Sequence, residues 1–339
     1  MSLSTITDTL NRPLRDLRIS VTDRCNFRCT YCMPKEIFGR DYVFLARDEL
    51  LSFEEITRLT RIFVASGVEK VRLTGGEPLL RRDIEKLVAM LADIDGMHDI
   101  AMTTNGSLLT PAMAGKLKDA GLKRITVSLD SLDDETFKSL NDVDFPASKV
   151  LDAIDAAANA GLTPVKVDMV VKRGVNDNDV VDMARHFRGS GHILRFIEYM
   201  DVGTTNGWRM DDVVSAREIA DQINAEWPIE PVEANYFGEV AERYRYVDGA
   251  GEIGIIASVT IPFCAACTRS RLTADGQLFT CLFGVHGHDF RAPLRSGASD
   301  QDIGAFLGRV WGQRTDRYSE VRSEDTIKLE KVEMSRIGG

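Results

Sequence analysis

Hydrophobic residues follow two alternating spacings along residues 18–199. Apolar positions at helical spacing are followed by a glycine, a short linker and a compact apolar run, and this unit recurs. Helices are expected at 53–66, from 83, from 111 to 120, at 148–160 and at 178–188. Strands are expected at 18–22, 70–74, 99–104, 124–129, 165–170 and 194–199. Strands that alternate with helices predict a parallel sheet with right-handed crossovers.

The helix boundaries carry signals of their own. Ser52 and Glu55 have the spacing of a capping box, and Gly67 ends the helix that they begin. Thr110 and Pro111 read as an N-cap followed by a proline in the first turn. These signals place two helix starts independently of the apolar pattern.

Six strands are too few for a closed eight-stranded barrel, and about 200 residues is at the low end for one. We therefore expect an incomplete (β/α)6 parallel barrel, an α/β fold with ligands at the carboxyl ends of its strands. After about Trp208 the repeat fails and hairpin-like patterns replace it. Gly, Thr and Asn gather at 201–207, so the sequence predicts a barrel domain at 1–203 and a smaller, β-rich C-terminal domain at 204–339.

Three cysteines follow the first expected strand at the spacing Cys25-x3-Cys29-x2-Cys32. Three thiolates on one loop can hold three irons of a 4Fe-4S cluster and leave the fourth iron open. A zinc site would need a nearby fourth cysteine or histidine, and none lies within thirty residues on either side. The spacing therefore favours a cluster.

The other three cysteines of the chain form a second triad, Cys264, Cys267 and Cys281. This triad could take zinc with His286 or His288 as the fourth ligand, or it could hold a second cluster with a vacant iron. The first triad makes the cluster the preferred interpretation. Arg269 and Arg271 follow Cys267 at strand spacing, so their side chains are expected on one side of a strand, beside the triad.

Composition limits the classes of partner. The chain has 339 residues, 44% of them hydrophobic, and a formal net charge of −10. Nucleic-acid binding depends on a basic surface, so an acidic chain needs a local basic pocket to bind an anionic substrate. No apolar run is long enough for a membrane span. Two cysteine triads without a leader segment favour a reducing, cytoplasmic location.

Nucleotide-binding loops are not expected. Gly249, Gly251 and Gly254 fit the dinucleotide pattern, but a strand follows them instead of a helix, so no helix N-terminus can hold a pyrophosphate. A hairpin turn between strands at 244–247 and 255–259 is the better interpretation. The Walker pattern is absent from the sequence, so a nucleoside triphosphate would have to be bound by side chains.

The loop Cys25-Asn-Phe-Arg-Cys29-Thr-Tyr31-Cys32 resembles the cluster loop of the radical S-adenosylmethionine (radical SAM) superfamily. Gly75-Gly76-Glu77-Pro78, at the end of the second strand, resembles the superfamily motif that meets the methionine amino group of the cofactor. The resemblance implies that the open iron of the first cluster chelates S-adenosylmethionine, and that the partial barrel is of radical SAM type.

Further motifs narrow the resemblance. They are Arg12-Pro-Leu-Arg-Asp-Leu-Arg18, Thr103-Thr-Asn-Gly106, Phe196-Ile-Glu-Tyr-Met200-Asp-Val-Gly203, Cys267-Thr-Arg-Ser-Arg271 and Gly338-Gly339. Together they resemble the GTP 3′,8-cyclase (MoaA) family of molybdenum cofactor biosynthesis over nearly the whole chain.

The resemblance implies a role for each matching residue. The first 4Fe-4S cluster would be held by Cys25, Cys29 and Cys32, and an auxiliary 4Fe-4S cluster that meets the guanine by Cys264, Cys267 and Cys281. S-adenosylmethionine would be lined by Tyr31, Gly76, Ser128 and Met200. GTP would be contacted by Arg18, Arg72, Thr103, Lys166, Arg269, Ser270 and Arg271, with Lys70 and Arg195 as weaker candidates. The expected catalytic residues are Arg18, Arg269 and Arg271.

The implied activity is that of a lyase converting GTP to (8S)-3′,8-cyclo-7,8-dihydroguanosine 5′-triphosphate, the first step of the pathway. A 5′-deoxyadenosyl radical would take hydrogen from C3′ of GTP, and the carbon radical would attack C8 of the guanine. The implied partners are a low-potential electron donor and the pyranopterin-forming enzyme that acts next, while a homodimer stays open. The alternatives are a two-cluster radical SAM maturase with another substrate, and a non-enzymatic iron-sulfur electron carrier.

Overall fold

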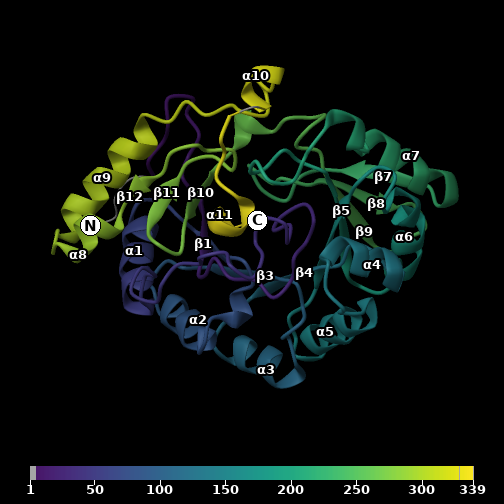
Figure 1. The fold of residues 1–339 in the computed structure, drawn as a ribbon, viewed down its shortest axis with the longest axis horizontal. Helices are drawn as coiled ribbons and strands as arrows, with labels where there is room; N and C mark the ends of the chain where they lie inside the picture. The colour runs from purple at the N-terminus through teal and green to yellow at the C-terminus, as the bar shows by residue number, and fades with distance from the viewer. Residues whose placement is uncertain (1–4, 328, 339) are drawn as a thin grey trace.

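The computed structural model describes residues 5–327 and 329–338. One sheet of twelve strands runs through them in the order β12-β11-β10-β1-β2-β3-β4-β5-β6-β9-β8-β7. The sheet curls around a central space, and most helices cover its outside (Figure 1). The described strands at its two ends, β12 and β7, do not pair with each other, so the curled sheet is open.

Six parallel strands form the middle of the sheet, which confirms the predicted partial barrel. They are β1 (Asp16–Ser20), β2 (Lys70–Thr74), β3 (Asp99–Thr104), β4 (Arg124–Ser128), β5 (Lys166–Val171) and β6 (Ile193–Glu198). The helices between them are α1 (Phe53–Ala65), α2 (Ile84–Ala92), α3 (Pro111–Asp119), α4 (Asp134–Asn141), α5 (Ala147–Asn159) and α6 (Val180–Phe187). The helix predicted at 148–160 is α5.

The helix α4 is an addition to the predicted pattern. It has eight residues, and Phe137 and Leu140 are its buried apolar side chains. Two apolar positions in so short a helix give too little periodicity to recognise from sequence. Its start is nevertheless marked, because the side chain of Asp133 accepts a hydrogen bond from the Thr136 amide.

Residues beyond 203 extend the sheet at both ends. After α7 (Ala216–Glu226) come β7 (Ile229–Val232), β8 (Glu242–Tyr246) and β9 (Glu252–Ile256), and then β10 (Arg269–Leu272), β11 (Gln277–Phe279), β12 (His288–Asp289), α8 (Arg291–Arg295), α9 (Asp300–Gly312), α10 (Glu324–Ile327) and α11 (Met334–Ile337). Strand β9 pairs in parallel with β6, and β10 pairs in parallel with β1. The two predicted domains thus share one sheet, and their division at residue 203 stays a prediction.

The glycine-rich segment before β9 is the predicted hairpin turn, since β8 and β9 are antiparallel.

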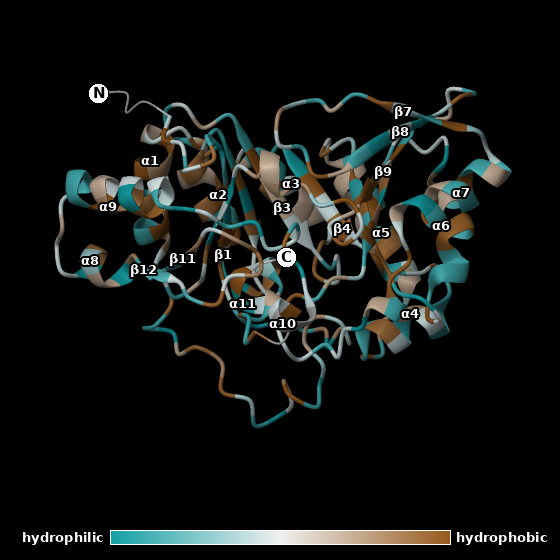
Figure 2. Ribbon diagram, turned by 90° about the horizontal axis from the view of Figure 1, so that it is seen from above, coloured by the Kyte–Doolittle hydropathy of each residue, from teal (hydrophilic) through white to brown (hydrophobic). Residues whose placement is uncertain are grey.

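Successive side chains along the barrel strands point alternately to the hydrophobic core and to the interior cavity. Leu17, Ile19, Val71 and Leu73 are buried in one hydrophobic core with the inward faces of the surrounding helices. The intervening residues, such as Arg18, line a cavity inside the barrel. Figure 2 shows helices that combine hydrophobic and hydrophilic positions, as expected when one face covers a sheet. Among the described residues, no helix is long and apolar enough to cross a membrane.

The predicted helix starts at Ser52 and Thr110 are confirmed. Ser52 and Glu55 form both hydrogen bonds of a capping box, and the Thr110 side chain accepts a hydrogen bond from the Met113 amide. At the other end of the chain, α11 lies over the central space of the barrel (Figure 1). The C-terminal segment thereby returns to the inner face of strands that were formed by the first half of the chain.

Candidate active site inside the barrel

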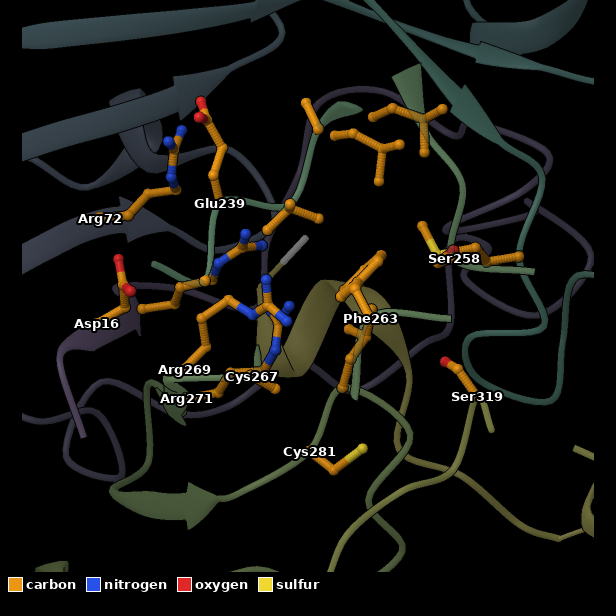
Figure 3. Close-up of a pocket in the computed structure, with 18 of the residues that line it drawn as sticks. Asp16, Arg72, Glu239, Ser258, Phe263, Cys267, Arg269, Arg271, Cys281 and Ser319 are labelled. Atoms are coloured by element: carbon orange, nitrogen blue, oxygen red, sulfur yellow. The ribbon is translucent and has the colours of Figure 1, made fainter. Parts of the chain in front are cut away.

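Three arginines occupy one register row on adjacent parallel strands. Arg18 of β1 lies opposite Arg271 of β10 on one side and Arg72 of β2 on the other. All three side chains line the same cavity, and Figure 3 shows Arg72 and Arg271 within it. Parallel pairing of β10 with β1 therefore joins residues that are about 250 positions apart in sequence.

A second row lies two residues nearer to the strand starts, on the same face. Asp16 of β1 lies opposite Arg269 and Lys70. The Lys70 ammonium is 3.4 Å from the Asp16 carboxylate, and the Arg269 guanidinium stacks on the Phe263 ring at 4.9 Å. One buried nitrogen of Arg269, Nη1, has no hydrogen-bond partner in the structure. Its free donor is available to a ligand in the cavity.

The opposite wall of the cavity comes from β3, β5 and β6. Arg72 donates hydrogen bonds to the hydroxyl groups of Thr103 (2.9 Å) and Thr126 (3.0 Å). Arg195 makes a two-pronged ion pair with Asp168, at 2.7 and 2.9 Å. Lys166 also lines this wall. These contacts hold the cations in fixed positions around the central space.

Burial and mutual repulsion lower the pKa values of the clustered cations. The pKa of Arg18 lies well below its ordinary value because the group is buried and faces Arg271, Arg72 and Arg269. Burial lowers the pKa of Arg72 and of Arg271 to about 10, and that of Lys166 to about 8. Burying these cations and placing them close together both cost free energy. A bound polyanion offsets the burial and the repulsion, so such a cavity favours a polyanionic ligand.

The predicted GTP contacts separate into two groups. Those that line the cavity are Arg18, Arg72, Thr103, Lys166, Arg269 and Arg271, together with Lys70 and Arg195. Ser270 does not line it; its side chain is buried on the other face of β10 and donates to the Asp16 carbonyl at 3.3 Å. The cavity also begins at the first residues of the strands, such as Lys70 and Lys166, and so extends deeper than the strand ends where we expected the ligands.

The second cysteine triad borders the same cavity. Cys264, Cys267 and Cys281 are all among its lining residues, and Figure 3 shows Arg269 and Arg271 next to Cys267. Burial acts to raise the pKa of Cys267, but Arg269 and Arg314 overcome it and lower the value to about 6. Burial raises the pKa of Cys281 to about 12. The neighbouring cations thus stabilise the thiolate form of Cys267, the form that binds iron.

The first triad lies on the loop after β1. Burial raises the pKa of Cys25 to about 11, and the pKa values of Cys29 and Cys32 are also raised, first by burial and then by the neighbouring acidic groups, the other thiols among them. The Asn105 side chain approaches Cys25 Sγ at 3.8 Å, and the Phe27 amide does so at 3.4 Å. Three thiols close enough to repel one another when ionised, with donors beside one of them, fit a cluster that would neutralise their charge.

All six cysteines are free thiols. Among the described residues, no three His, Cys, Asp or Glu side chains are placed to hold a single metal ion. His286 and His288 are exposed and do not line the cavity with the second triad. Neither histidine is therefore placed as a fourth ligand of a zinc site.

The Gly75-Gly76-Glu77-Pro78 segment packs against the backbone of the first cysteine loop. A Cβ atom on Gly76 would lie 2.2 Å from the Arg24 carbonyl oxygen, and the Gly76 amide donates to the Thr22 carbonyl at 2.9 Å. Only glycine allows so close an approach. Glu77 is fully buried and accepts hydrogen bonds from the Thr104 hydroxyl (2.7 Å) and from a backbone amide of the next strand end. Burial raises its pKa to about 7.

The residues predicted for S-adenosylmethionine have different surroundings. The Tyr31 hydroxyl donates to Asp130 at 2.8 Å, which links the cysteine loop to the end of β4. Ser128 is the last residue of β4, and Met200 lines the large cavity and packs near Phe283. Gly76 lies against the cysteine loop, as described above. The four roles stay predictions.

Sequence analysis missed several cavity residues. Asp168 follows Lys166 at a spacing of two, a signal that could have revealed it. The loop at 233–241 gave no such signal, because its irregular backbone is placed only by tertiary contacts. Tyr236 from this loop accepts a hydrogen bond from Lys70 at 2.8 Å, and a Cβ on Gly238 would lie 2.8 Å from the Ala266 carbonyl oxygen.

Part of the predicted Gly-Gly tail also reaches this region. Gly338 is buried, and its carbonyl oxygen accepts a hydrogen bond from Arg271. A Cβ at Gly338 would lie 1.9 Å from the Thr74 hydroxyl oxygen, and the backbone φ there is +75°. Glycine is therefore required at this position. Gly339 lies outside the described residues.

Comparisons with known proteins agree with this arrangement. A profile of the radical SAM superfamily matches residues 19–187, and one described as Molybdenum Cofactor Synthesis C matches residues 192–320. A GTP 3′,8-cyclase of Acidothermus cellulolyticus is 56% identical over 359 aligned residues, covering 98% of this chain and 99% of that protein. The chain belongs to the GTP 3′,8-cyclase family. Another member, from Staphylococcus carnosus, is 50% identical over 338 residues with the same coverage.

A solved structure outside the GTP 3′,8-cyclase family shares the fold. Streptococcus suis SuiB, crystallised with S-adenosylmethionine, has a TM-score of 0.61 and 15% identity, covering 94% of this chain and 73% of that one. The family assignment confirms the resemblance that the cysteine loop and the other motifs indicated. The long coverage means that both halves of the chain belong to the shared fold.

Proposed function

We propose that the protein converts GTP to (8S)-3′,8-cyclo-7,8-dihydroguanosine 5′-triphosphate, the first step of molybdenum cofactor biosynthesis. The observation that carries the proposal is one cavity bordered by a free cysteine triad and lined by cations from both halves of the chain. High identity to GTP 3′,8-cyclases over the full length supports it.

The two triads fit two 4Fe-4S clusters. Cys25, Cys29 and Cys32 would hold the cluster that binds S-adenosylmethionine, and Cys264, Cys267 and Cys281 would hold the second cluster. When bound, the first cluster and S-adenosylmethionine supply the radical chemistry that removes one hydrogen atom from C3′ of the substrate. Tyr31, Gly76, Ser128 and Met200 would line the cofactor.

The basic residues bind and orient the substrate. Arg18, Arg72, Arg269 and Arg271 can each give two parallel hydrogen bonds to phosphate oxygens, and Lys166 supplies a further positive charge. Binding of the triphosphate by the barrel interior leaves the guanine end toward the triad that borders the cavity. The expected catalytic residues Arg18, Arg269 and Arg271 act by holding C3′ and C8 in reacting geometry, and the enclosing wall excludes water.

The remaining partners follow from this chemistry. A radical SAM reaction needs a low-potential electron donor, and the cyclic nucleotide must pass to a pyranopterin-forming enzyme of the same pathway. We also propose a cytoplasmic location, which six free cysteines support.

The decisive experiment is anaerobic incubation of the iron-reconstituted protein with dithionite, S-adenosylmethionine and GTP. We expect 5′-deoxyadenosine and the 3′,8-cyclised nucleotide to form together, and ATP in place of GTP to give no cyclised product. 5′-Deoxyadenosine formed without any change to GTP would contradict the proposed substrate.

A further inference from the structure

Arg314 is buried against the second cysteine triad. It follows α9, and its side chain is 1% exposed. One guanidinium nitrogen, Nη2, lies 3.2 Å from Cys267 Sγ, and another, Nη1, donates to the Cys267 carbonyl oxygen at 2.8 Å. The guanidinium also stacks on the Trp311 ring at 4.5 Å. Arg314 therefore contacts both the thiol and the backbone of one ligand residue.

A second arginine, Arg12, contacts the backbone of Cys264 and is joined to Arg314 through Asp8. Asp8, whose side chain is 0% exposed, accepts a hydrogen bond from Arg12 at 2.6 Å and one from Arg314 at 3.3 Å. Arg12 in turn donates to the Cys264 carbonyl oxygen at 2.8 Å. The Trp311 indole donates to the Arg12 carbonyl oxygen at 3.0 Å. Segments from both ends of the chain thus fix the backbone of Cys264 and Cys267.

Burying these charged side chains costs more free energy than an apolar contact at the same place would. Two arginines and a carboxylate have been removed from water, and paired charges in such positions are seldom the most stabilising choice. A fixed positive charge that donates to a thiolate ligand has a specific consequence for iron and sulfur. It stabilises the more negative, reduced form of a cluster and so raises the reduction potential.

We propose that Arg314 is a positioning residue that holds Cys267 as a ligand and raises the reduction potential of the second cluster. The inference rests on the proposed function, since it requires a cluster at the second triad. It assigns a role to a side chain from the C-terminal segment that none of the recognised sequence motifs contains.

The test measures the one-electron reduction of the second cluster by dithionite. The full-length chain carries Cys25→Ala, Cys29→Ala and Cys32→Ala, so that only the second cluster contributes to the electron paramagnetic resonance signal during a redox titration. We expect Arg314→Gln to move the midpoint potential to a more negative value or to lower the iron bound per chain. Arg314→Lys should give a smaller change, because it keeps the charge but loses the guanidinium geometry.

Arg317→Gln is the matched control. Arg317 lies three residues away, is 53% exposed and pairs with Glu320, so its loss should leave both iron content and potential unchanged. Full iron content and a wild-type midpoint potential in Arg314→Gln would overturn the inference. Should Arg314→Gln fail to fold, Arg314→Lys decides by the same criterion. A second triad that binds no iron in the parent protein would instead contradict the proposed function, and this inference with it.

Discussion

At the residue scale, the site depends on cations that the fold places close together despite their mutual repulsion. Arg18 lies between Arg72 and Arg271 in one register row. Arg271 is buried and the other two are half-buried, and the pKa values of all three are lowered. The acidic chain as a whole repels a triphosphate, whereas this cavity attracts it. The local arrangement of a few side chains, and not the net charge, therefore determines the ligand.

Replacing Arg269 or Arg271 by Ala should leave cluster content intact and lower kcat/KM for GTP by roughly ten- to hundredfold. Each lost charge-assisted hydrogen bond is worth about 1.5 to 3 kcal/mol. Lysine should restore only part of the activity, because it cannot bond two oxygens at once. Steady-state kinetics with iron analysis provides the measurement, and Arg309→Ala, on the outer helix α9, is the control. Wild-type turnover in both alanine variants would place the triphosphate elsewhere.

Lys166 gives the site a pH dependence. Burial, then Arg195 and the other nearby arginines, lowers its pKa to about 8. Lys166 therefore loses its positive charge as the pH rises through about 8, and KM for GTP should rise by up to about tenfold above that pH. In Lys166→Arg, the charge persists and this rise should disappear. Parallel pH profiles for KM in the two proteins would show that Lys166 does not bind the triphosphate.

At the element scale, the first triad lies on one loop after β1, whereas the second joins Cys264 and Cys267, before β10, to Cys281, after β11. The two triads should have different roles in the reaction. Cys29→Ala should abolish reductive cleavage of S-adenosylmethionine, since its loop follows β1 in the manner of a radical SAM site. Cys267→Ala should keep some cleavage and lose cyclisation, because Cys267 borders the cavity with the basic residues. The two products, 5′-deoxyadenosine and cyclised nucleotide, are quantified in the same reaction. Cyclisation at the wild-type rate by Cys267→Ala would exclude a substrate role for the second cluster.

The loop at 233–241 covers one side of the cavity. Tyr236 bonds Lys70, and the Lys70 ammonium also lies 4.5 Å from the Tyr236 ring. Tyr236→Ala should free this loop and raise KM for GTP by about three- to tenfold, the loss expected for one hydrogen bond and its ring contact. Phe237→Ala is a matched control, because Phe237 is 54% exposed and does not line the cavity. Equal KM values in the two variants would show that this loop does not contribute to GTP binding through Tyr236.

At the scale of the whole molecule, the C-terminal segment connects the two halves. Asp201, just after β6, is buried and pairs with Lys331 at 3.1 Å and with Arg322 at 3.1 Å. Glu333 accepts hydrogen bonds from Thr204. These contacts bring Gly338 to Arg271 inside the barrel.

Gly338→Ala should therefore disturb the site without unfolding the protein. Its Cβ would clash with the Thr74 hydroxyl at a backbone conformation that only glycine adopts easily. We expect slower product formation with an unchanged thermal midpoint, and a similar result when Gly338 and Gly339 are both deleted. Gly297→Ala, also at positive φ but in open space, controls for backbone strain alone. Full turnover in the Gly338 variants would mean that the tail has no part in the reaction.

The sequence by itself determined the repeat of helices and strands, the cysteine spacings and the family. These features are local: amphipathic periods, caps such as Ser52, and metal ligands held within one loop depend on neighbours in the chain. Alternation within strands also indicated that Arg269 and Arg271 share one side of a strand. The short helix α4 was missed because two buried apolar residues do not establish a period.

Only the tertiary structure decided what meets inside the barrel. Parallel pairing of β10 with β1 brings Arg271 beside Arg18, and packing places Arg314 on Cys267, contacts between segments that are far apart in sequence. It also brought Tyr236 to the edge of the cavity. Such contacts depend on strand register and on chain segments that return across the fold, and neither leaves a periodic signal in the sequence. Local chemistry was therefore predictable, whereas the assembly of the cavity was not.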